Sequence, residues 1–337
     1  MYRDHTVGVV VPAYNEETLV GRVVETMPEF VDRVYLVDDA STDDTWAEIN
    51  DAVATAREAE ALDDGSIHGA FDERWVPIQH DDNQGVGGAI LTGYRRALAD
   101  DIDATAVMAG DAQMDPDVLP RLLDPVVEGE AEYVKASRLL RREDWTGMPP
   151  FRLFGNLMLT GLTRISSGYW RMTDPQNGYT VISQHALTEL DLDTLYEDYG
   201  FANDLLVRLN AHGMPIADVE TPSEFFYEDE EWDSHIDLKT FVPKTSVLLL
   251  RNFFWRLRRD GGPGPVRSFL ALYAVGAVGV VVALVLLLSS VVAPAGDSLD
   301  GSPSLLVAGG LSLLLGFALD LGSNAGLHTR VYAGADE

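Results

Sequence analysis

The sequence predicts an α/β protein with a mostly parallel sheet and flanking helices, followed by an interfacial helix and two transmembrane helices. Short β-branched runs alternate with helix-length segments over residues 6–220, and a polar turn follows each run. Strands joined through helices build parallel sheets in which these turns gather at one edge. The C-terminal part instead contains two long apolar stretches. We therefore expect a sheet domain over residues 1–238, an interfacial segment over 239–265 and a membrane anchor over 266–337.

Four strands are expected in the first part of the chain. Each is a short run of apolar and β-branched residues: 6–11, 34–37, 75–78 and 104–108. Helical patterns follow over residues 18–27 and from 83 to 98. Ser41 or Thr42 is suited to cap the helix after the second strand, because a hydroxyl can accept a backbone N–H. Residues 58–73, rich in Asp, Glu and Ala, predict a solvated insertion.

Two C-terminal stretches are apolar enough to cross a bilayer. Residues 268–292 carry no charge, and they exceed the roughly 20 residues that a membrane-spanning helix needs. The second stretch, about 304–321, is shorter and contains Asp320. A buried hairpin or a re-entrant segment is the alternative for this second stretch. The sequence predicts two transmembrane helices, over about 268–292 and 304–321.

The charges that flank the first span predict its orientation. Five arginines precede it: Arg251, Arg256, Arg258, Arg259 and Arg267. The loop at 294–303 has acids but no Lys or Arg, and no basic segment with an apolar run precedes the first strand. Because cytoplasmic flanks are the cationic ones, we expect a multi-pass protein of the cell membrane whose sheet domain and both termini are cytoplasmic.

Residues 238–259 interleave aromatic and leucine side chains with lysines and arginines. This pattern is typical of a helix in the membrane surface, with its apolar side in lipid and its cations at the headgroups. A helix packed on the core is the alternative, but this is the only basic stretch of an acidic chain. Membrane lipid is therefore an expected partner. The following Gly261-Gly-Pro-Gly-Pro265 predicts a hinge.

The composition excludes several kinds of partner and site. The chain has 54 acidic and 24 basic residues and a formal net charge of −30. Such a surface repels nucleic acid over most of its area, so no nucleic-acid partner is expected. The acid excess is spread along the chain, as in proteins of salt-accumulating halophiles, where salt screens the self-repulsion. Because cysteine is absent, disulfides and thiolate metal sites are excluded.

The run Val107-Met-Ala-Gly-Asp111-Ala-Gln113-Met-Asp-Pro116 ends an apolar strand in a short acidic turn. Ligands of open α/β sheets bind beyond the carboxyl ends of the strands. Asp111 and Gln113 are two oxygen donors at such a position, where a divalent cation and its phosphates would bind. A solvated Asp-rich turn is the alternative.

Two further turns carry candidate ligand-binding residues. Asp39, after the second strand, could hydrogen-bond a base or a ribose, or could complement the positive end of the next helix. The Asn83-Gln-Gly-Val-Gly-Gly88 turn lacks the Gly-Lys-Ser/Thr of a P-loop. Its glycines suit close helix–strand packing as well as phosphate binding. The combination of these turns at one sheet edge favours a nucleotide site.

Six motifs follow one another along residues 6–240: Val9-Val-Val-Pro-Ala-Tyr-Asn-Glu16, Val37-Asp-Asp-Ala-Ser-Thr-Asp43, Asn83-Gln-Gly-Val-Gly-Gly-Ala89, Gly110-Asp-Ala-Gln-Met-Asp-Pro116, Ala136-Ser-Arg138 and Asp174-Pro-Gln-Asn-Gly-Tyr179. In this order they resemble the GT-A glycosyltransferases of family 2, and within it the dolichyl- or polyprenyl-phosphate hexose synthases. The resemblance implies a GT-A fold. It also implies an inverting, metal-dependent transfer of a hexose from a GDP- or UDP-sugar to dolichyl or polyprenyl phosphate, for N-glycan or surface-glycan assembly.

The resemblance implies roles for particular residues. The residues that would hold the nucleotide of the sugar donor are Pro12, Tyr14, Glu16, Asp39 and Gly85. Asp111 and Gln113 match the ligands of Mg²⁺ or Mn²⁺, and Arg138 matches a phosphate-facing arginine. Asp204 lies where the broader family places an acidic base, although a helix-start acid or an organiser of the acceptor loop is the alternative. The implied catalytic residues are Asp111, Arg138 and Asp204.

The chain departs from the family pattern in three places. Ala109 replaces the first Asp of the usual Asp-X-Asp, which leaves one carboxylate for the metal. Thr180 stands where related synthases often carry Arg, and residues 230–236 lack the Arg and Lys of the usual tail motif. These departures reduce the cationic support of a diphosphate. A non-catalytic sugar-nucleotide-binding membrane protein is therefore one alternative, and a transferase acting on a sugar hydroxyl of a lipid-linked glycan is another.

Residues 141–156 combine arginines and Asn156 with several apolar and aromatic side chains. An apolar loop with a few cations suits a lipid phosphate that arrives from the membrane. A mobile core-packing segment is the alternative. A processive polysaccharide synthase is disfavoured, because the chain has no Gln-X-X-Arg-Trp motif and only two predicted spans.

Overall fold

The computed structural model of the protein describes all residues except 63–70, 141–149, 222–237, 260–265, 293–301 and 333–337. The described part contains one eight-stranded sheet in the order β3-β2-β1-β4-β6-β5-β7-β8. Its strands are β1 (Val7–Ala13), β2 (Arg33–Asp38), β3 (Trp75–Gln79), β4 (Ala104–Val107), β5 (Tyr133–Ser137), β6 (Thr180–Ser183), β7 (Ile216–Glu220) and β8 (His328–Val331). The predicted α/β class is confirmed, and the four predicted strands lie within two residues of their expected bounds.

β6 makes the sheet mixed. It runs antiparallel to β4 and β5, whereas the other neighbouring strands pair in parallel. Two antiparallel steps restore the original direction, so β5 and β7 end at the same edge as β1, β2 and β4. The turns after these strands therefore share the edge at which ligands of α/β sheets bind.

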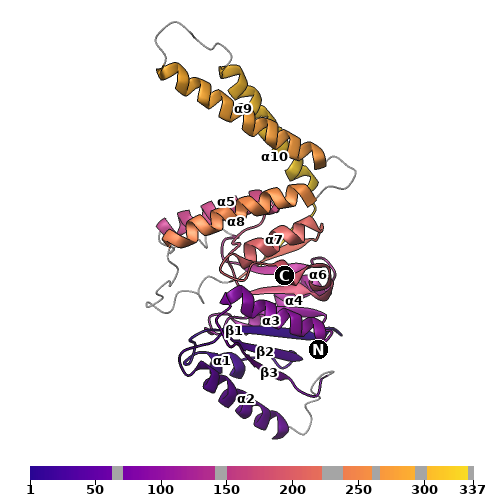
Figure 1. Ribbon diagram of the computed structural model, residues 1–337. Coiled ribbons are helices and arrows are strands. Elements are labelled where there is room, and N and C mark those ends of the chain that lie inside the picture. The colour runs from indigo at the N-terminus through magenta and orange to yellow at the C-terminus, as the bar shows by residue number, and fades with distance from the viewer. Residues whose placement is uncertain (63–70, 141–149, 222–237, 260–265, 293–301, 333–337) are drawn as a thin grey trace.

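Helices cover both faces of the sheet (Figure 1). The helices of this part are α1 (Val20–Glu25), α2 (Thr45–Leu62), α3 (Gly85–Ala99), α4 (Leu119–Val127), α5 (Pro150–Ser167), α6 (Gln184–Glu189) and α7 (Phe201–Ala211), with 3₁₀ turns at Pro116–Val118 and Leu192–Thr194. α1, α2 and α4 pack on one face, and α3, α6 and α7 on the other. β1 contributes to both cores because alternate side chains point to opposite faces, with Val9 and Val11 on the first side and Val10 on the second.

The start of α2 differs from the prediction. The helix begins at Thr45, so neither Ser41 nor Thr42 is its cap. Ser41 Oγ instead accepts the N–H of Asn15, and the Asp43 carboxylate accepts the N–H of Thr45. Because the capping position is Asp44, Thr42 and Ser41 lie two and three residues too early to reach the first free N–H groups of the helix. The helix also continues to Leu62, so the first part of the predicted solvated insertion is helical, and residues 63–70 lie outside the described part.

α8 (Leu238–Arg259) lies beside α5 (Figure 1) and packs on α7. Its buried side includes Leu248, Leu249 and Leu257. The exposed side carries apolar and cationic side chains together: Val247, Leu250, Phe254, Lys244, Arg251 and Arg258. The neighbouring α5 exposes three more apolar side chains, Leu157, Met158 and Leu162. The position of this exposed side in a membrane surface stays a prediction. The predicted hinge at 261–265 lies outside the described residues.

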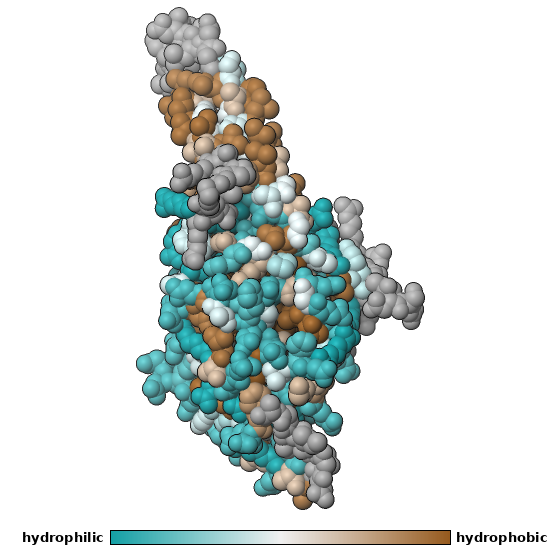
Figure 2. Space-filling model, turned by 90° about the vertical axis from the view of Figure 1, so that its right-hand side faces the viewer, coloured by the Kyte–Doolittle hydropathy of each residue, from teal (hydrophilic) through white to brown (hydrophobic). Residues whose placement is uncertain are grey.

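α9 (Val266–Val292) and α10 (Ser302–Ser323) form an apolar hairpin that projects from the sheet domain (Figure 1). Phe269–Leu288 and Pro303–Ser323 are long and apolar enough to cross a membrane, and only 17% of each is buried, unlike a helix inside a soluble core. Figure 2 shows apolar residues covering the projecting part, above a largely hydrophilic body. The helices touch through glycine: a Cβ on Gly309 would lie 2.8 Å from the backbone N of Val280. Small residues allow such close approach of membrane helices.

Arg256 and Asp320 form a buried ion pair where the hairpin meets the sheet domain. Arg256 Nη2 lies 2.8 Å from Asp320 Oδ2, and both side chains are at most 1% exposed. Arg256 also donates to the carbonyl oxygens of Ile165 and Ser166 near the end of α5. The sequence placed Arg256 among the cations that flank the first span. The structure corrects this assignment, because its charge is neutralised inside the protein by the acid that α10 provides.

After α10 the chain returns to the sheet. Asn324 accepts a hydrogen bond from Asn210 of α7, and β8 then pairs in parallel with β7. The predicted anchor over 266–337 therefore ends in a strand of the sheet domain. Sequence reasoning missed this strand because four residues are too few to show a period. Both ends of the hairpin consequently lie at the sheet domain.

Candidate active site

Three turns meet at the carboxyl edge of the sheet. The Gly110 N–H donates to the Pro12 carbonyl oxygen at 3.0 Å, and the Asp39 N–H donates to that of Ala13 at 2.9 Å. Glycine suits position 110 because a Cβ there would lie 3.0 Å from the Cβ of Ala13. The predicted residues on these turns are thereby gathered in one region: Pro12, Tyr14, Glu16, Asp39, Asp111 and Gln113. Tyr14 is exposed there.

Asp39 is buried and holds the turn that follows β3. Its Oδ1 accepts the Gln84 N–H at 2.8 Å and lies 2.7 Å from His80 Nδ1. Its Oδ2 accepts the Gly85 N–H at 2.8 Å. His80 is fixed in turn, because its Nε2 lies 2.9 Å from Thr92 Oγ1 of α3. Asp39 thus lies in the predicted nucleotide region with both carboxylate oxygens already hydrogen-bonded within the protein.

Gly85 is explained by packing. Its φ of +83° is in the left-handed region, and a Cβ there would lie 2.8 Å from the carbonyl oxygen of Glu197. The Gly88 N–H donates to the same oxygen at 2.9 Å. Since the Gly85 N–H is used by Asp39, these contacts favour the close-packing interpretation of the glycine-rich turn over direct phosphate binding.

Carboxylates crowd the edge beside the 110–113 turn. Burial raises the pKa of Asp111, whose Oδ1 accepts the Gln113 N–H at 3.1 Å. Burial, followed by the charges of Asp111 and Asp43, raises the pKa of Glu16 to about 7. The raised pKa of Glu16 means that its ionised carboxylate is partly desolvated and is repelled by Asp111 and Asp43. A bound cation would relieve this repulsion.

The residues at this edge fit a metal ion that is held partly by the protein and partly by a bound phosphate ligand. In the described part of the chain, no group of three or more His, Asp or Glu side chains is arranged to hold a metal. Asp111 and Gln113 belong to one turn, and the charge of Asp111 reaches Glu16. A carboxylate and an amide oxygen suit Mg²⁺ or Mn²⁺, which commonly keep water and substrate phosphates as further ligands. Asp111 therefore stays the predicted anionic ligand of such an ion.

Glu16→Gln is expected to stabilise the protein at about pH 8, with a smaller effect at about pH 5. Because the pKa of Glu16 is raised, this group supports folding most below its ordinary pKa of 4.5, and the contribution is lost as the pH rises toward about 7. Gln keeps the shape without the charge. Since the side chain is partly exposed, the gain should be about 1 kcal/mol or less. Thermal unfolding of both proteins at the two pH values tests this, and a loss of stability at the higher pH would contradict it.

Arg138 follows β5 and makes a bidentate pair with Asp174. Its Nε lies 2.8 Å from Asp174 Oδ2, and its Nη2 lies 3.1 Å from Oδ1. Burial by itself would raise the pKa of Asp174, but the charges of Arg138 and Lys135 outweigh it and lower that pKa. The carboxylate is therefore ionised at neutral pH. Because β5 ends at the same edge as β4, Arg138 is held on the side of the sheet where the Asp111 turn lies.

Residues 174–179 connect Arg138 with the Asp111 turn. Asp174 begins this segment in a left-handed backbone conformation, with a φ of 43°. At its other end, the Tyr179 hydroxyl donates to the Asp115 carbonyl oxygen at 3.1 Å. One segment thus contacts Arg138 at its first residue and the stretch that follows the Asp111 turn at its last residue.

Asp204, the predicted base, lies at the start of α7 and is 1% exposed. Its Oδ1 accepts from Asn252 Nδ2 of α8 at 2.8 Å. Its Oδ2 accepts the Tyr196 N–H at 3.0 Å and Arg208 Nε at 3.2 Å. The carboxylate therefore joins α7, α8 and the segment before α7. These contacts favour the organiser interpretation over that of a proton acceptor.

Asp204→Asn is expected to cost stability rather than catalysis. The amide cannot accept hydrogen bonds at both ends, so either the Asn252 donor or the Tyr196 and Arg208 donors lose their acceptor, at a cost of about 1–3 kcal/mol. Transfer per folded molecule should stay within about threefold of the wild type, whereas loss of a catalytic base costs about 100-fold or more. Unfolding midpoints and turnover of the same preparations separate the two roles.

Sequence reasoning missed four residues that support this site: His80, Lys135, Asp218 and His328. Lys135 offered a signal, since a lysine inside the apolar strand Tyr-Val-Lys-Ala-Ser needs a buried acid. Its Nζ lies 2.8 Å from Asp218, and His328 Nε2 lies 3.3 Å from the same carboxylate. No local pattern marks the other three. The predicted lipid-facing residues at 141–149 and the tail segment at 230–236 lie outside the described residues.

Carboxylates, an amide and a fixed arginine thus lie at the carboxyl edge of an α/β sheet, where proteins of this fold class bind their ligands. Residues 8–191 match the sequence profile of Glycosyl transferase family 2. The chain belongs to this family and is a glycosyltransferase, which confirms the resemblance carried by the six motifs.

Two relatives of this chain carry a lipid phosphate in their names. UDP-N-acetylglucosamine–dolichyl-phosphate N-acetylglucosaminyltransferase of Methanococcus voltae is 28% identical over 224 residues, 65% of this chain and 87% of that protein. Undecaprenyl-phosphate mannosyltransferase of Micrococcus luteus is 31% identical over 223 residues, 64% of this chain and 82% of that protein. A solved structure of Mycobacterium tuberculosis glucosyl-3-phosphoglycerate synthase with UDP is 20% identical, with a TM-score of 0.49, and the alignment covers 77% of this chain and 82% of that one.

Proposed function

We propose that the protein transfers a hexose from a GDP- or UDP-sugar to dolichyl or polyprenyl phosphate, with inversion at the anomeric carbon. The observation that carries the proposal is the shared sheet edge of Asp111 and the Arg138–Asp174 pair, in a family 2 chain with an apolar two-helix hairpin. The acceptor class is supported by the relatives, whose names specify dolichyl and undecaprenyl phosphate. The product would serve N-glycan or surface-glycan assembly.

The roles of the protein groups follow from their chemistry. Pro12, Tyr14 and Glu16 border the nucleotide, and Asp111 with Gln113 would hold Mg²⁺ or Mn²⁺ beside the donor diphosphate. When bound, the metal supplies Lewis-acid neutralisation of the leaving diphosphate. Arg138 would donate hydrogen bonds to the same phosphates from a position that Asp174 fixes before the donor binds.

The acceptor requires little acid–base help. A phosphate oxygen of the lipid would attack the anomeric carbon from the side opposite the diphosphate, the bond to the diphosphate breaks, and the configuration inverts. A phosphate monoester is ionised near neutral pH, so no proton has to be removed from the nucleophile. Catalysis then depends on positioning and on charge stabilisation. The commitment of Asp204 to structural contacts agrees with a reaction that needs no protein base.

We further infer a membrane location for the reaction. α9 and α10 would span the bilayer, while the exposed apolar and cationic side of α8 and the exposed side of α5 would lie in its cytoplasmic surface. Both ends of the hairpin lie at the sheet domain because β8 rejoins the sheet. The sheet domain and the termini would therefore share the cytoplasmic side. A lipid phosphate in the same leaflet is then within the reach of the domain.

Sugar transfer into lipid tests the proposal. Membranes that contain the protein are incubated at high salt with radiolabelled UDP- and GDP-sugars, with Mn²⁺ or with EDTA, beside membranes without it. Mn²⁺-dependent label in an acid-labile, organic-extractable lipid is the expected result, and it names the sugar. Label confined to water-soluble or oligosaccharide-linked product would replace the acceptor by a sugar hydroxyl. Donor binding without transfer from any donor would support a non-catalytic protein.

A further inference from the structure

The strand that follows the membrane hairpin reaches the core of the sheet domain. β8 pairs with β7 in parallel, with His328 opposite Ile216 and Arg330 opposite Asp218. The His328 side chain is 2% exposed and lies over the Asp218 carboxylate, with Nε2 3.3 Å from Oδ2. Arg330 donates to the carbonyl oxygen of Arg171. Side chains of this edge strand therefore contact polar groups inside the sheet domain, in addition to the backbone pairing with β7.

The Asp218 carboxylate is fully buried, and its negative charge is stabilised by neighbouring groups. Lys135 Nζ lies 2.8 Å from its Oδ1, and His328 approaches the Oδ2 from the other side. The same Oδ2 accepts the backbone N–H of Thr173 at 2.6 Å and the Thr173 hydroxyl at 2.7 Å. Burial by itself would raise the pKa of Asp218, but Lys135 and His328 outweigh it and hold that pKa well below its ordinary range. The ionised carboxylate is thus a fixed acceptor for Thr173.

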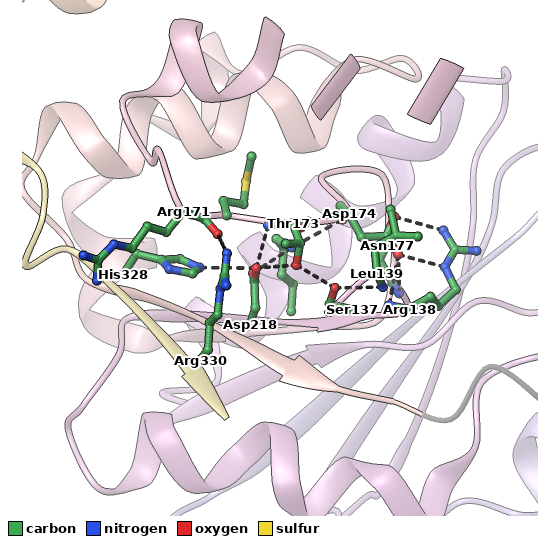
Figure 3. Close-up of polar contacts among 12 residues, drawn as sticks. Ser137, Arg138, Leu139, Arg171, Thr173, Asp174, Asn177, Asp218, His328 and Arg330 are labelled. Atoms are coloured by element: carbon green, nitrogen blue, oxygen red, sulfur yellow. Dashed lines mark hydrogen bonds and ion pairs between the residues drawn. The ribbon is translucent and has the colours of Figure 1, made fainter. Parts of the chain in front are cut away.

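Thr173 links the fixed Asp218 carboxylate to Arg138. Its side-chain oxygen lies 2.7 Å from Ser137 Oγ, at the end of β5. The next residue, Asp174, holds the Arg138 guanidinium, and Lys135 Nζ donates to the carbonyl oxygens of both Thr173 and Asp174. Figure 3 shows these contacts as a continuous row from His328 through Asp218 and Thr173 to Asp174 and Arg138.

The conformation of Asp174 explains why such support is needed. A φ of 43° is uncommon for a residue other than glycine, and it persists where surrounding contacts determine it. Thr173 is anchored immediately before this position, and Arg138 is held by the side chain that the position carries. A shift of Thr173 would therefore move the guanidinium relative to the Asp111 turn. Small misplacements of a group that stabilises a transition state have large effects on rate.

We propose that His328, which the chain brings back from the membrane hairpin, is a positioning residue for Arg138 and acts through Asp218, Thr173 and Asp174. The inference deepens the proposed function and rests on it, because it assumes that Arg138 faces the donor diphosphate. On this proposal β8 contributes to catalysis. The active site then reaches its final geometry only after the α9–α10 hairpin has been synthesised and β8 has paired with β7.

A double-mutant cycle in the full-length protein tests this proposal. His328→Leu should lower kcat for transfer to lipid phosphate by about 10- to 100-fold, with a smaller change in KM for the donor. His328→Gln, which keeps a polar side chain able to donate an N–H toward Asp218, should recover much of the loss. Thr329→Val is the matched control, because this neighbouring side chain on β8 is exposed and should leave kcat unchanged.

The cycle with Arg138→Gln separates positioning from general stability. If His328 acts through Arg138, His328→Leu should change kcat by less than about twofold when Arg138 is already Gln, because the two effects are not additive. Additive losses, or an unaltered kcat in His328→Leu, would overturn the proposal. Should His328→Leu not fold, Thr173→Val interrupts the same row of contacts without touching β8 and carries the same expectation. A wild type that transfers no sugar would contradict the proposed function itself, which is a distinguishable outcome.

Discussion

Asp111→Ala is expected to lower sugar transfer to lipid phosphate by about 100-fold or more and to abolish the response to Mn²⁺. Ala109 occupies the position of the other acid of the usual pair, so Asp111 would be the anionic protein ligand of the proposed metal site. Without its carboxylate, the charge on the leaving diphosphate loses the cation that the turn would hold. Initial rates across a Mn²⁺ titration, for wild type and variant in the same membranes, measure the effect.

Two controls make this result specific. Asp117→Ala removes an exposed carboxylate six positions later and should leave both the rate and the Mn²⁺ dependence unchanged. Binding of Mn²⁺ in the presence of a nucleoside diphosphate should weaken in Asp111→Ala and not in Asp117→Ala. Full, Mn²⁺-stimulated activity in Asp111→Ala would remove this residue from the metal site.

Arg256→Met and Asp320→Leu are each expected to destabilise the protein by about 3–5 kcal/mol. Both side chains are at most 1% exposed, so each change leaves its former partner as a buried, uncompensated charge. Tyr273 and Asn324 also contact Asp320, so the defect would lie where both membrane helices meet the sheet domain. The midpoint of thermal unfolding in detergent, at one heating rate, measures the loss.

The double change Arg256→Met with Asp320→Leu is the matched control. It removes both charges together, so its loss of stability should be smaller than the sum of the two single losses. The loss should not vanish, because the carbonyl oxygens of Ile165 and Ser166 would still lack the donors that Arg256 supplies. Arg258→Met, on the exposed side of the same helix, should have little effect. Strictly additive single losses would show that the pair is not coupled.

The parts of the fold that sequence could predict are those with a local signal. The alternation of strand and helix patterns predicted the sheet and its polar edge, and two long, mostly apolar stretches predicted the hairpin. The candidate site was predictable to the same extent, because oxygen donors in the turn after a buried strand are visible in the sequence itself. Asp111, Gln113 and Arg138 were all predicted in this way or by resemblance, and their strands end at one edge.

The sequence by itself determined the fold class, the polar turns and the apolar hairpin, since each depends on the periodicity or chemistry of neighbouring residues. Only the tertiary structure decided the partners of buried charges: Asp204 with α8, Arg256 with Asp320, and Asp218 with both Lys135 and His328. These pairs join positions 48 to 110 residues apart. The physical reason is that a buried charge requires a partner but does not specify where in the chain that partner lies, which packing of the whole chain alone determines.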